Sequence, residues 1–178
     1  MALTSYPLRI GNCTKVVSSA LDSTLRPDIV FLSLSESEFP GRENDLPSDL
    51  VELAQMNSEF RINWVPGENT KTMKKVFPVL KYLDDDDVIM TMDDDRILDR
   101  RLLQSRYEDF ERIGRRAAVT ARRDVMCSNN MFTKGMMNGF DLFWTDDIIR
   151  TYHDDQYYTK VLYLNGYKFV CGSEFLLN

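Results

Sequence analysis

The chain has 178 residues, of which 43% are apolar and 28% are charged, and this composition is typical of a globular protein with one domain, residues 1–178. Its formal net charge of −6 disfavours broad binding of nucleic acid, and no apolar run approaches the roughly 18 to 20 residues that span a bilayer. The start, "MALTSYPLRI", lacks the pattern of a signal peptide, and Cys13, Cys127 and Cys171 contain no CxxC pair. We therefore expect a cytoplasmic protein, with peripheral attachment to a membrane left open.

Four short apolar runs predict strands. They cover residues 28–35, 87–93, 117–121 and 167–171, and several are bounded by proline or acidic residues. Continuous apolar runs of this length fit strands that are buried on both faces, as in a parallel sheet.

Helical patterns lie between these runs. Apolar residues recur at three- to four-residue intervals in residues 14–28, 47–56, 100–113 and 155–166. In the first of these, Leu25 is the last periodic residue and Pro27 marks the stop; the last ends at Asn165-Gly166, a left-handed cap. Residues 74–83 are ambiguous, because Pro78 either starts or kinks a helix. The alternation predicts an α/β fold with a mostly parallel central sheet flanked by helices.

The stretch "DDDDVIMTMDDD", residues 84–95, carries two acidic clusters on either side of a predicted strand. Residues 84–87 precede the strand, where we expect a solvated turn. Residues 93–95 follow it, at the strand end where ligands bind in open α/β sheets. If the chain stays extended, Asp93 and Asp95 point to the same side and can ligate Mg²⁺ or Mn²⁺. An EF-hand is excluded because the glycine and the closing glutamate are missing, and Ile97 disfavours an aspartyl phosphatase.

Six segments together resemble the nucleotide-sugar glycosyltransferases of the GT-A type, in particular their DxD-containing, inverting family-2-like members. In chain order they are "TSYPLRI" (4–10), "DIVFLSLSESEFP" (28–40), "LPSDLVEL" (46–53), "TKTMKKVFPVLKYL" (70–83), "VIMTMDDDRILDRRLL" (88–103) and "HDDQYYTKVLYLNGYK" (153–168). The resemblance covers nearly the whole chain. It implies the GT-A fold and an activity that moves a sugar from a nucleotide-diphosphate donor to a hydroxyl acceptor in glycan biosynthesis.

The resemblance also implies roles for the donor side of the site. Asp93 and Asp95 would hold Mn²⁺ or Mg²⁺ against the donor diphosphate, and Asp94 would lie near the donor ribose or sugar. UDP-sugars are the favoured donors. The remaining donor-binding candidates are Thr4, Tyr6, Arg9, Lys74 and Lys75, with these two lysines preferred over Lys71. An ordinary polar loop or surface lysines are the plainer interpretation.

On the acceptor side, Asp155 corresponds to the catalytic base and Asp154 to its acidic neighbour, at a helix N-terminus that favours ionised carboxylates; simple N-capping is the alternative. His153 is interpreted as a loop residue. Asn138, Gly139 and Trp144 are expected to face the acceptor, although an aromatic residue at 144 also fits a core position. The acceptor is a hydroxyl of a glycan, a lipid-linked sugar or a protein.

The sequence departs from the family in three places. Only Met1–Leu3 precede "TSYP", the acceptor loop "GMMNGF" is degenerate, and little chain follows the last predicted strand. A non-catalytic or weakly active module that binds a nucleotide sugar or a partner protein therefore stays open as an alternative. A Mg²⁺-dependent nucleotidyl or phosphoryl transferase is a third, though the P-loop pattern is missing.

Overall fold

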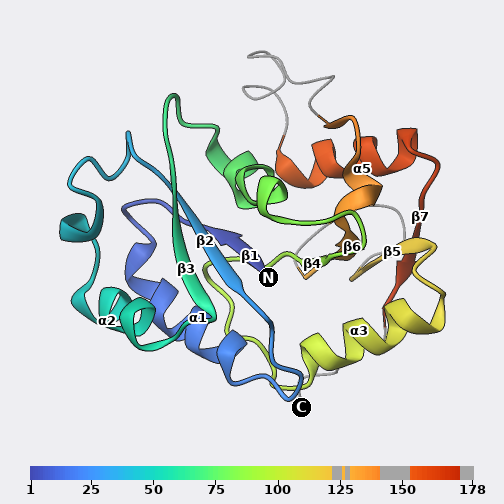
Figure 1. Cartoon of the computed structure of the whole chain (residues 1–178), viewed down its shortest axis with the longest axis horizontal. Helices are drawn as coiled ribbons and strands as arrows, with labels where there is room; N and C mark the ends of the chain where they lie inside the picture. Colours follow the sequence, from blue (N-terminus) through green and yellow to red (C-terminus); the bar gives the residue numbers. More distant parts are fainter. Residues whose placement is uncertain (122–125, 127–128, 141–152, 173–178) are drawn as a thin grey trace.

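The computed structural model describes residues 1–121, 126, 129–140 and 153–172 (Figure 1). Strands in this part of the chain form two sheets. The first is parallel, in the order β1–β2–β3, and consists of β1 (Ala2–Thr4), β2 (Val30–Ser35) and β3 (Phe60–Val65). The second has the order β4–β6–β5–β7 and consists of β4 (Val88–Met90), β5 (Ala117–Thr120), β6 (Met131–Thr133) and β7 (Lys168–Cys171). In this sheet β6 runs antiparallel to β4 and β5, while β7 is parallel to β5.

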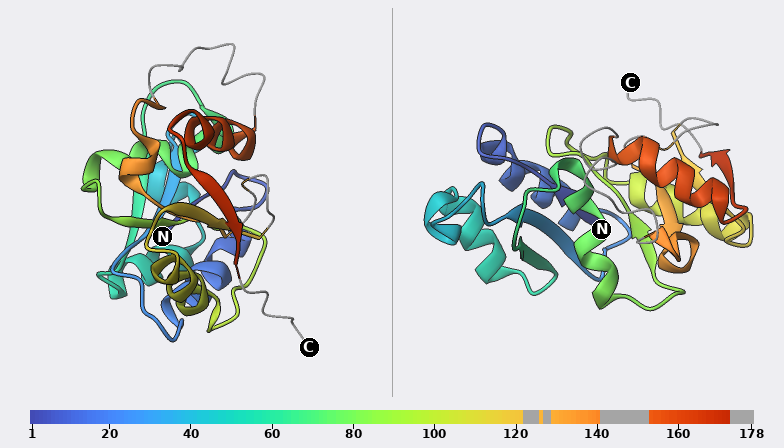
Figure 2. Two further views of the ribbon diagram at one scale, coloured as in Figure 1. Left: turned by 90° about the vertical axis from the view of Figure 1, so that its right-hand side faces the viewer. Right: turned by 90° about the horizontal axis from the view of Figure 1, so that it is seen from above.

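The two sheets meet at a narrow seam. A parallel bridge pairs Ala2 with Thr91, and the backbone N–H of Met92 donates a hydrogen bond to the carbonyl of Ala2 at 3.0 Å. Across this seam β1 lies beside β4. Figure 2 shows the first sheet with its helices at one end of the molecule and the second sheet at the other. The α/β fold with a mostly parallel sheet is thus confirmed, with β6 as the antiparallel member.

The four predicted helices are present: α1 (Cys13–Leu21), α2 (Ser48–Met56), α3 (Leu102–Arg112) and α5 (Asp154–Leu164). After α5, Gly166 has a φ of 81°, which confirms the left-handed cap. The predicted extension of α1 to Leu25 is wrong. The helix ends at Leu21 because the chain turns away, and the N–H of Thr24 donates to the carbonyl of Arg100 at 2.8 Å instead of continuing the helix.

Side-chain alternation divides the core into two layers. Leu3 and Leu32 are neighbours in register and face α1 and α2, with which they form one buried cluster. Ala2 and Phe31, one residue earlier on the same strands, face the opposite layer, which contains residues 73–80. In Figure 1 α1 and α3 lie on one side of the sheets, with α5 on the other. Helices therefore flank the sheet on both faces.

The ambiguous segment around Pro78 forms two short 3₁₀ helices, η3 (Lys71–Lys75) and η4 (Phe77–Tyr82). Pro78 stands in the first turn of η4, where its missing N–H costs no hydrogen bond. It therefore starts a new helix. No helix in the described part of the chain is long and apolar enough to cross a membrane.

Candidate functional site

A cavity of about 330 Å³ lies where β1 and β4 end at the seam. This is the sheet edge where ligands bind in open α/β folds. Four loop segments build its walls: the chain after β1, the chain after β2, the η3 region and the acidic run after β4. The lining residues are Thr4, Ser5, Tyr6, Arg9, Glu38, Asn69, Lys71, Thr72, Lys74, Lys75, Asp93, Asp94 and Asp95. The structure thus brings all the candidate donor-binding and metal-binding residues to one cavity.

The two acidic clusters have different surroundings, as expected from their places around the strand. Residues 84–87 are exposed and form a turn in which the N–H of Asp87 donates to the carbonyl of Asp84 at 3.0 Å. Lys134 pairs with Asp85 at 2.5 Å on this edge. Residues 93–95 lie at the other end of β4, in the wall of the cavity. The solvated turn before the strand is confirmed.

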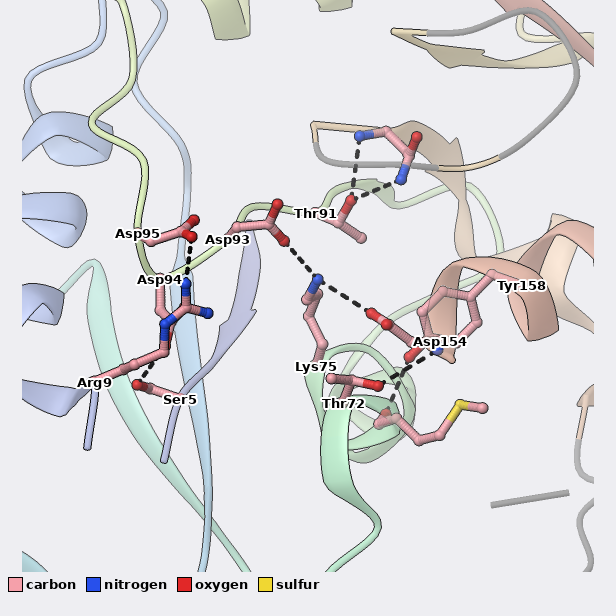
Figure 3. Close-up of polar contacts among 12 residues, drawn as sticks. Ser5, Arg9, Thr72, Lys75, Thr91, Asp93, Asp94, Asp95, Asp154 and Tyr158 are labelled. Carbon is pink, nitrogen blue, oxygen red and sulfur yellow. Dashed lines mark hydrogen bonds and ion pairs between the residues drawn. The ribbon is translucent and has the colours of Figure 1, made fainter. Parts of the chain in front are cut away.

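Each carboxylate of residues 93–95 has a polar partner on another element (Figure 3). Asp93 accepts a hydrogen bond from Lys75 Nζ at 2.9 Å. Asp94 is buried; it accepts a hydrogen bond from Ser5 Oγ at 2.6 Å and lies 3.1 Å from Arg9 Nη1. Asp95 is exposed and forms an ion pair with Arg9 Nη2. The buried middle residue therefore anchors the loop, while its two neighbours face the cavity.

Lys75 connects this loop to the start of α5. Its ammonium also lies 3.1 Å from Asp154 Oδ2, so it stands between two carboxylates. Burial alone lowers the pKa of Lys75, but the charges of Asp154 and Asp93 outweigh burial and raise the pKa above its ordinary value. Lys75 is therefore a permanent positive charge in the wall of the cavity.

Lys74 points to a different part of the same cavity. Its ammonium donates to Glu38 Oε2 at 2.7 Å and to Asn69 Oδ1 at 3.1 Å. Both lysines are buried, whereas Lys71 is exposed, so the sequence-based preference for Lys74 and Lys75 over Lys71 selects the two that are enclosed.

The N-terminus of α5 is attached to η3. The backbone N–H of Asp154 donates to Thr72 Oγ1 at 3.4 Å, and the buried hydroxyl of Tyr158 donates to the Met73 carbonyl at 3.0 Å. Asp154 is buried and Asp155 is half-buried. Burial, and then the charge of Asp154, raise the pKa of Asp155 to about 6. The expected effect of the helix N-terminus, which favours ionisation, is therefore outweighed by desolvation.

Some of the remaining candidate residues lie at the cavity, and others lie away from it. Tyr6 is partly exposed at the cavity, and the Thr4 hydroxyl donates to the Ser33 carbonyl at 2.7 Å. His153 is an exposed residue next to α5. Asn138 and Gly139 do not line the cavity: the Asn138 carbonyl accepts from Asn165 Nδ2 at 2.8 Å, and the Asn138 side chain bonds with Asp85 in the turn before β4. Trp144 lies outside the described residues.

Sequence reasoning missed four polar residues of the cavity: Ser5, Glu38, Asn69 and Thr72. Glu38 and Ser5 lie inside segments that the family resemblance singled out, so the resemblance could have identified them as candidates. Thr72 also lies in such a segment, residues 70–83, whereas Asn69 has no such signal, because its partner Lys74 is identified only by the folded geometry.

The oxygen atoms that the cavity offers as metal ligands fit a hard divalent cation. Asp93 and Asp95 offer carboxylate oxygens, the ligands that Mg²⁺ and Mn²⁺ prefer. Within the described residues no three acidic, histidine or cysteine side chains gather into a cage for a metal. Mg²⁺ at nucleotide sites commonly takes one or two carboxylates and completes its shell with phosphate and water, so a pair of aspartates is a sufficient protein contribution.

Comparison with solved structures identifies the fold. The chain is similar to a mannosyltransferase from Pyrobaculum calidifontis in complex with GDP-Man and Mn²⁺, with a TM-score of 0.69 and 12% identity over 95% of this chain and 52% of that chain. S. aureus TarS 1–349 gives 0.67 and 10% identity over 96% and 58%. A Francisella tularensis 2-C-methyl-D-erythritol 4-phosphate cytidylyltransferase gives 0.58 and 13% identity over 93% and 79%.

The chain thus spans only a little more than half the length of the mannosyltransferase and TarS structures. No protein-family model matches the chain, and no curated protein matches it in sequence. At identities of 10 to 13% these similarities establish the fold alone. The fold is that of GT-A-like nucleotide-sugar transferases.

Proposed function

We propose that the protein is a metal-dependent glycosyltransferase that moves a sugar from a nucleotide-diphosphate donor to a hydroxyl acceptor with inversion. One observation carries the proposal: residues from the ends of β1 and β4, η3 and the loop after β2 converge on one cavity that contains Asp93 and Asp95. The GT-A-like fold supports it, because the cavity lies at the carboxyl ends of parallel strands.

The donor is proposed to bind along the cavity wall. Arg9, Lys74 and Lys75 supply positive charge for a diphosphate, and Tyr6 offers a partly exposed ring for the base. Asp94 is held by Ser5 and Arg9, so its proposed role shifts from a direct contact with the sugar to fixing the loop. A UDP-sugar is the donor that the sequence favours, and the mannosyltransferase similar to this chain binds GDP-Man. Both bases belong in any binding assay.

Asp93 and Asp95 would hold the divalent cation, which when bound supplies Lewis-acid stabilisation of the charge on the departing diphosphate. The chain's own groups add to this. Arg9 and Lys75 flank the same carboxylates, so positive charge from the protein lies beside the position of the leaving group. Because these cations are held by several carboxylates, they need little rearrangement during reaction.

The base is proposed to be Asp155. With a pKa of about 6 it is mostly ionised at neutral pH and a strong enough base to accept a proton from an attacking hydroxyl. Asp154 supports it by anchoring the helix start to Lys75 and Thr72. The acceptor is a hydroxyl of a glycan, a lipid-linked sugar or a protein. Asn138, Gly139 and Trp144 stay proposals for its binding, although the first two lie beyond the cavity lining.

Substitution of the two metal-ligand candidates tests the proposal. Asp93→Ala and Asp95→Ala are expected to abolish Mn²⁺-dependent binding of GDP or UDP and Mn²⁺-dependent turnover of nucleotide sugars. Asp86→Ala is the matched control, since it removes an exposed carboxylate from the turn at the opposite end of β4. If the Asp93 and Asp95 variants behave like the Asp86 variant, the assignment is wrong.

Two other functions, nucleotide-sugar binding without turnover and nucleotidyl transfer, can be distinguished from glycosyl transfer by experiment. The degenerate acceptor loop "GMMNGF" favours the first alternative, a module that binds a nucleotide sugar without turnover. Calorimetry then shows metal-dependent binding, with no transfer to any acceptor tested. Similarity to the cytidylyltransferase supports nucleotidyl transfer. Such an enzyme releases pyrophosphate from a nucleoside triphosphate, whereas a glycosyltransferase releases a nucleoside diphosphate, so phosphate analysis separates them.

A further inference from the structure

The two outer carboxylates of residues 93–95 both form ion pairs with positively charged side chains of the protein. Lys75 Nζ lies 2.9 Å from Asp93 Oδ1, and Arg9 Nη2 forms an ion pair with Asp95 (Figure 3). The two cations come from different elements, η3 and the loop after β1. A divalent cation that binds Asp93 and Asp95 would therefore share these oxygens with ammonium and guanidinium groups or displace them.

Each of the two cations has a second carboxylate partner outside the candidate ligand pair. Lys75 lies 3.1 Å from Asp154 Oδ2, and Arg9 Nη1 lies 3.1 Å from Asp94 Oδ1. Both second partners are buried, with side chains 7% and 6% exposed. When a ligand displaces Lys75 from Asp93 or Arg9 from Asp95, the positive group therefore stays tethered at the cavity. It is then available to a new anionic partner.

The charge balance favours joint binding of a cation and a diphosphate. A bare Mn²⁺ ion must approach Asp93 and Asp95 against two fixed positive charges, and it disrupts two charge-assisted contacts. A nucleoside diphosphate provides phosphate oxygens that can replace Asp93 and Asp95 as partners of Lys75 and Arg9. Each ligand therefore removes an obstacle to the other, and such coupling is reciprocal by thermodynamic necessity.

We propose that Arg9 and Lys75 are internal counter-ions of the cation site, which hold Asp95 and Asp93 until a nucleoside diphosphate takes over the two positive groups. This inference rests on the proposed function, because it takes Asp93 and Asp95 as the cation ligands. It makes the metal bind weakly alone and tightly with nucleotide. It also gives Arg9 and Lys75 two opposite effects: they hinder the bare cation and assist the diphosphate.

The test is a Mn²⁺ titration followed by the electron paramagnetic resonance signal of free Mn²⁺, with and without GDP or UDP. The unmodified chain should bind Mn²⁺ at least about 5-fold more tightly with nucleotide present. Arg9→Gln and Lys75→Met should each tighten binding of Mn²⁺ alone and weaken binding of the nucleotide, so that the coupling falls toward 1. Lys71→Met is the matched control: Lys71 lines the same cavity, and the structure gives it no ion pair with a described carboxylate.

Separate controls test whether each variant still folds. Lys75 is buried, so its loss leaves Asp154 without its cation; Lys75→Met combined with Asp154→Asn removes both charges of this pair. Arg9 is 39% exposed, and Arg9→Gln disturbs no core packing. Melting curves confirm that each variant is folded before titration.

The outcomes separate the two proposals. If the unmodified chain binds no Mn²⁺ even with nucleotide, or if Asp93→Ala and Asp95→Ala change nothing, the proposed function fails. If the unmodified chain shows the coupling and both counter-ion variants retain it with unchanged Mn²⁺ affinity, the function stands and the counter-ion proposal is overturned. Tight binding of Mn²⁺ alone by the unmodified chain also overturns it.

Discussion

The carboxyl group of Asp155 is half-buried beside a second carboxylate, and this environment raises its pKa to about 6. A base must be ionised to accept a proton, so the active fraction falls as the pH drops through 6. We therefore predict that kcat/KM for sugar transfer declines below about pH 6. Asp155→Asn should lower transfer by about 10²- to 10⁴-fold while donor binding persists. A pH profile that stays flat down to pH 4 would contradict the assignment.

The same pKa shift has a consequence for stability. The folded protein holds the Asp155 proton more tightly than the unfolded chain, whose aspartates titrate near 3.8. Ionisation of Asp155 therefore lowers the free energy of unfolding. This loss has its full size above about pH 6 and is absent below about pH 3.8. Because solvent screens a half-buried group, we expect Asp155→Asn to stabilise the ligand-free protein by about 1 kcal/mol at pH 7.5.

Thermal unfolding of the ligand-free protein checks this expectation. One kcal/mol corresponds to about 2 to 4 °C in Tm for a chain of this size. The gain should be present at pH 7.5 and should shrink as the pH falls toward 4. A variant that is less stable than the parent at pH 7.5 would show that Asp155 ionised makes favourable contacts instead.

At the scale of single residues, the sequence identified the cavity well but not the contacts inside it. The strand-end position of Asp93 and Asp95 and the family resemblance placed the outer aspartates and the basic residues at one site. The contact of Ser5 with Asp94 joins positions 89 residues apart and has no local signature. Arg9 was expected to bind the donor, and in the structure it pairs with Asp94 and Asp95, which only the folded geometry brings close.

Among the elements, the cap of α5 allows a clean comparison of two glycines. Gly166 has a φ of 81° with open space around it, whereas Gly11 also has open space but no such φ. We predict that Gly166→Ala lowers stability by about 1 kcal/mol, because a Cβ disfavours the left-handed region. Gly11→Ala should be neutral or slightly stabilising, since Ala restricts the unfolded chain. Chemical denaturation of both variants measures the difference, and equal losses would contradict the role of φ.

The elements that sequence predicts and misses differ in their burial pattern. Strand β2 was found because all of its residues are buried, which gives a mostly apolar run. Strand β3 was missed because it has no continuous apolar run: Arg61 is exposed and Asn63 is a buried polar residue. This strand lies at the edge of its sheet. The end of α1 was misplaced because Thr24 bonds with Arg100, a contact across 76 residues.

At the scale of the whole molecule, ligand binding should appear as stabilisation. A ligand that binds only the folded state at 100 times its Kd adds about 2.7 kcal/mol. We predict that GDP or UDP raises Tm in the presence of Mn²⁺ and does so much less after addition of EDTA. A thermal-shift panel of nucleotide diphosphates and nucleotide sugars, each with and without Mn²⁺, measures this. Equal shifts with and without the metal would contradict metal dependence.

The narrow seam between the two sheets gives the cavity a mechanical role. Arg9 follows β1 and Asp93 follows β4, so a ligand that contacts both links the two sheets across the Ala2–Thr91 bridge. The N–H of Met92 donates to Ala2 over that bridge, and it is exchangeable only when the seam opens. Binding of nucleotide with Mn²⁺ should therefore slow hydrogen exchange at Met92 more than within β2. The backbone of one residue would thus report how firmly the donor holds the two halves of the fold together.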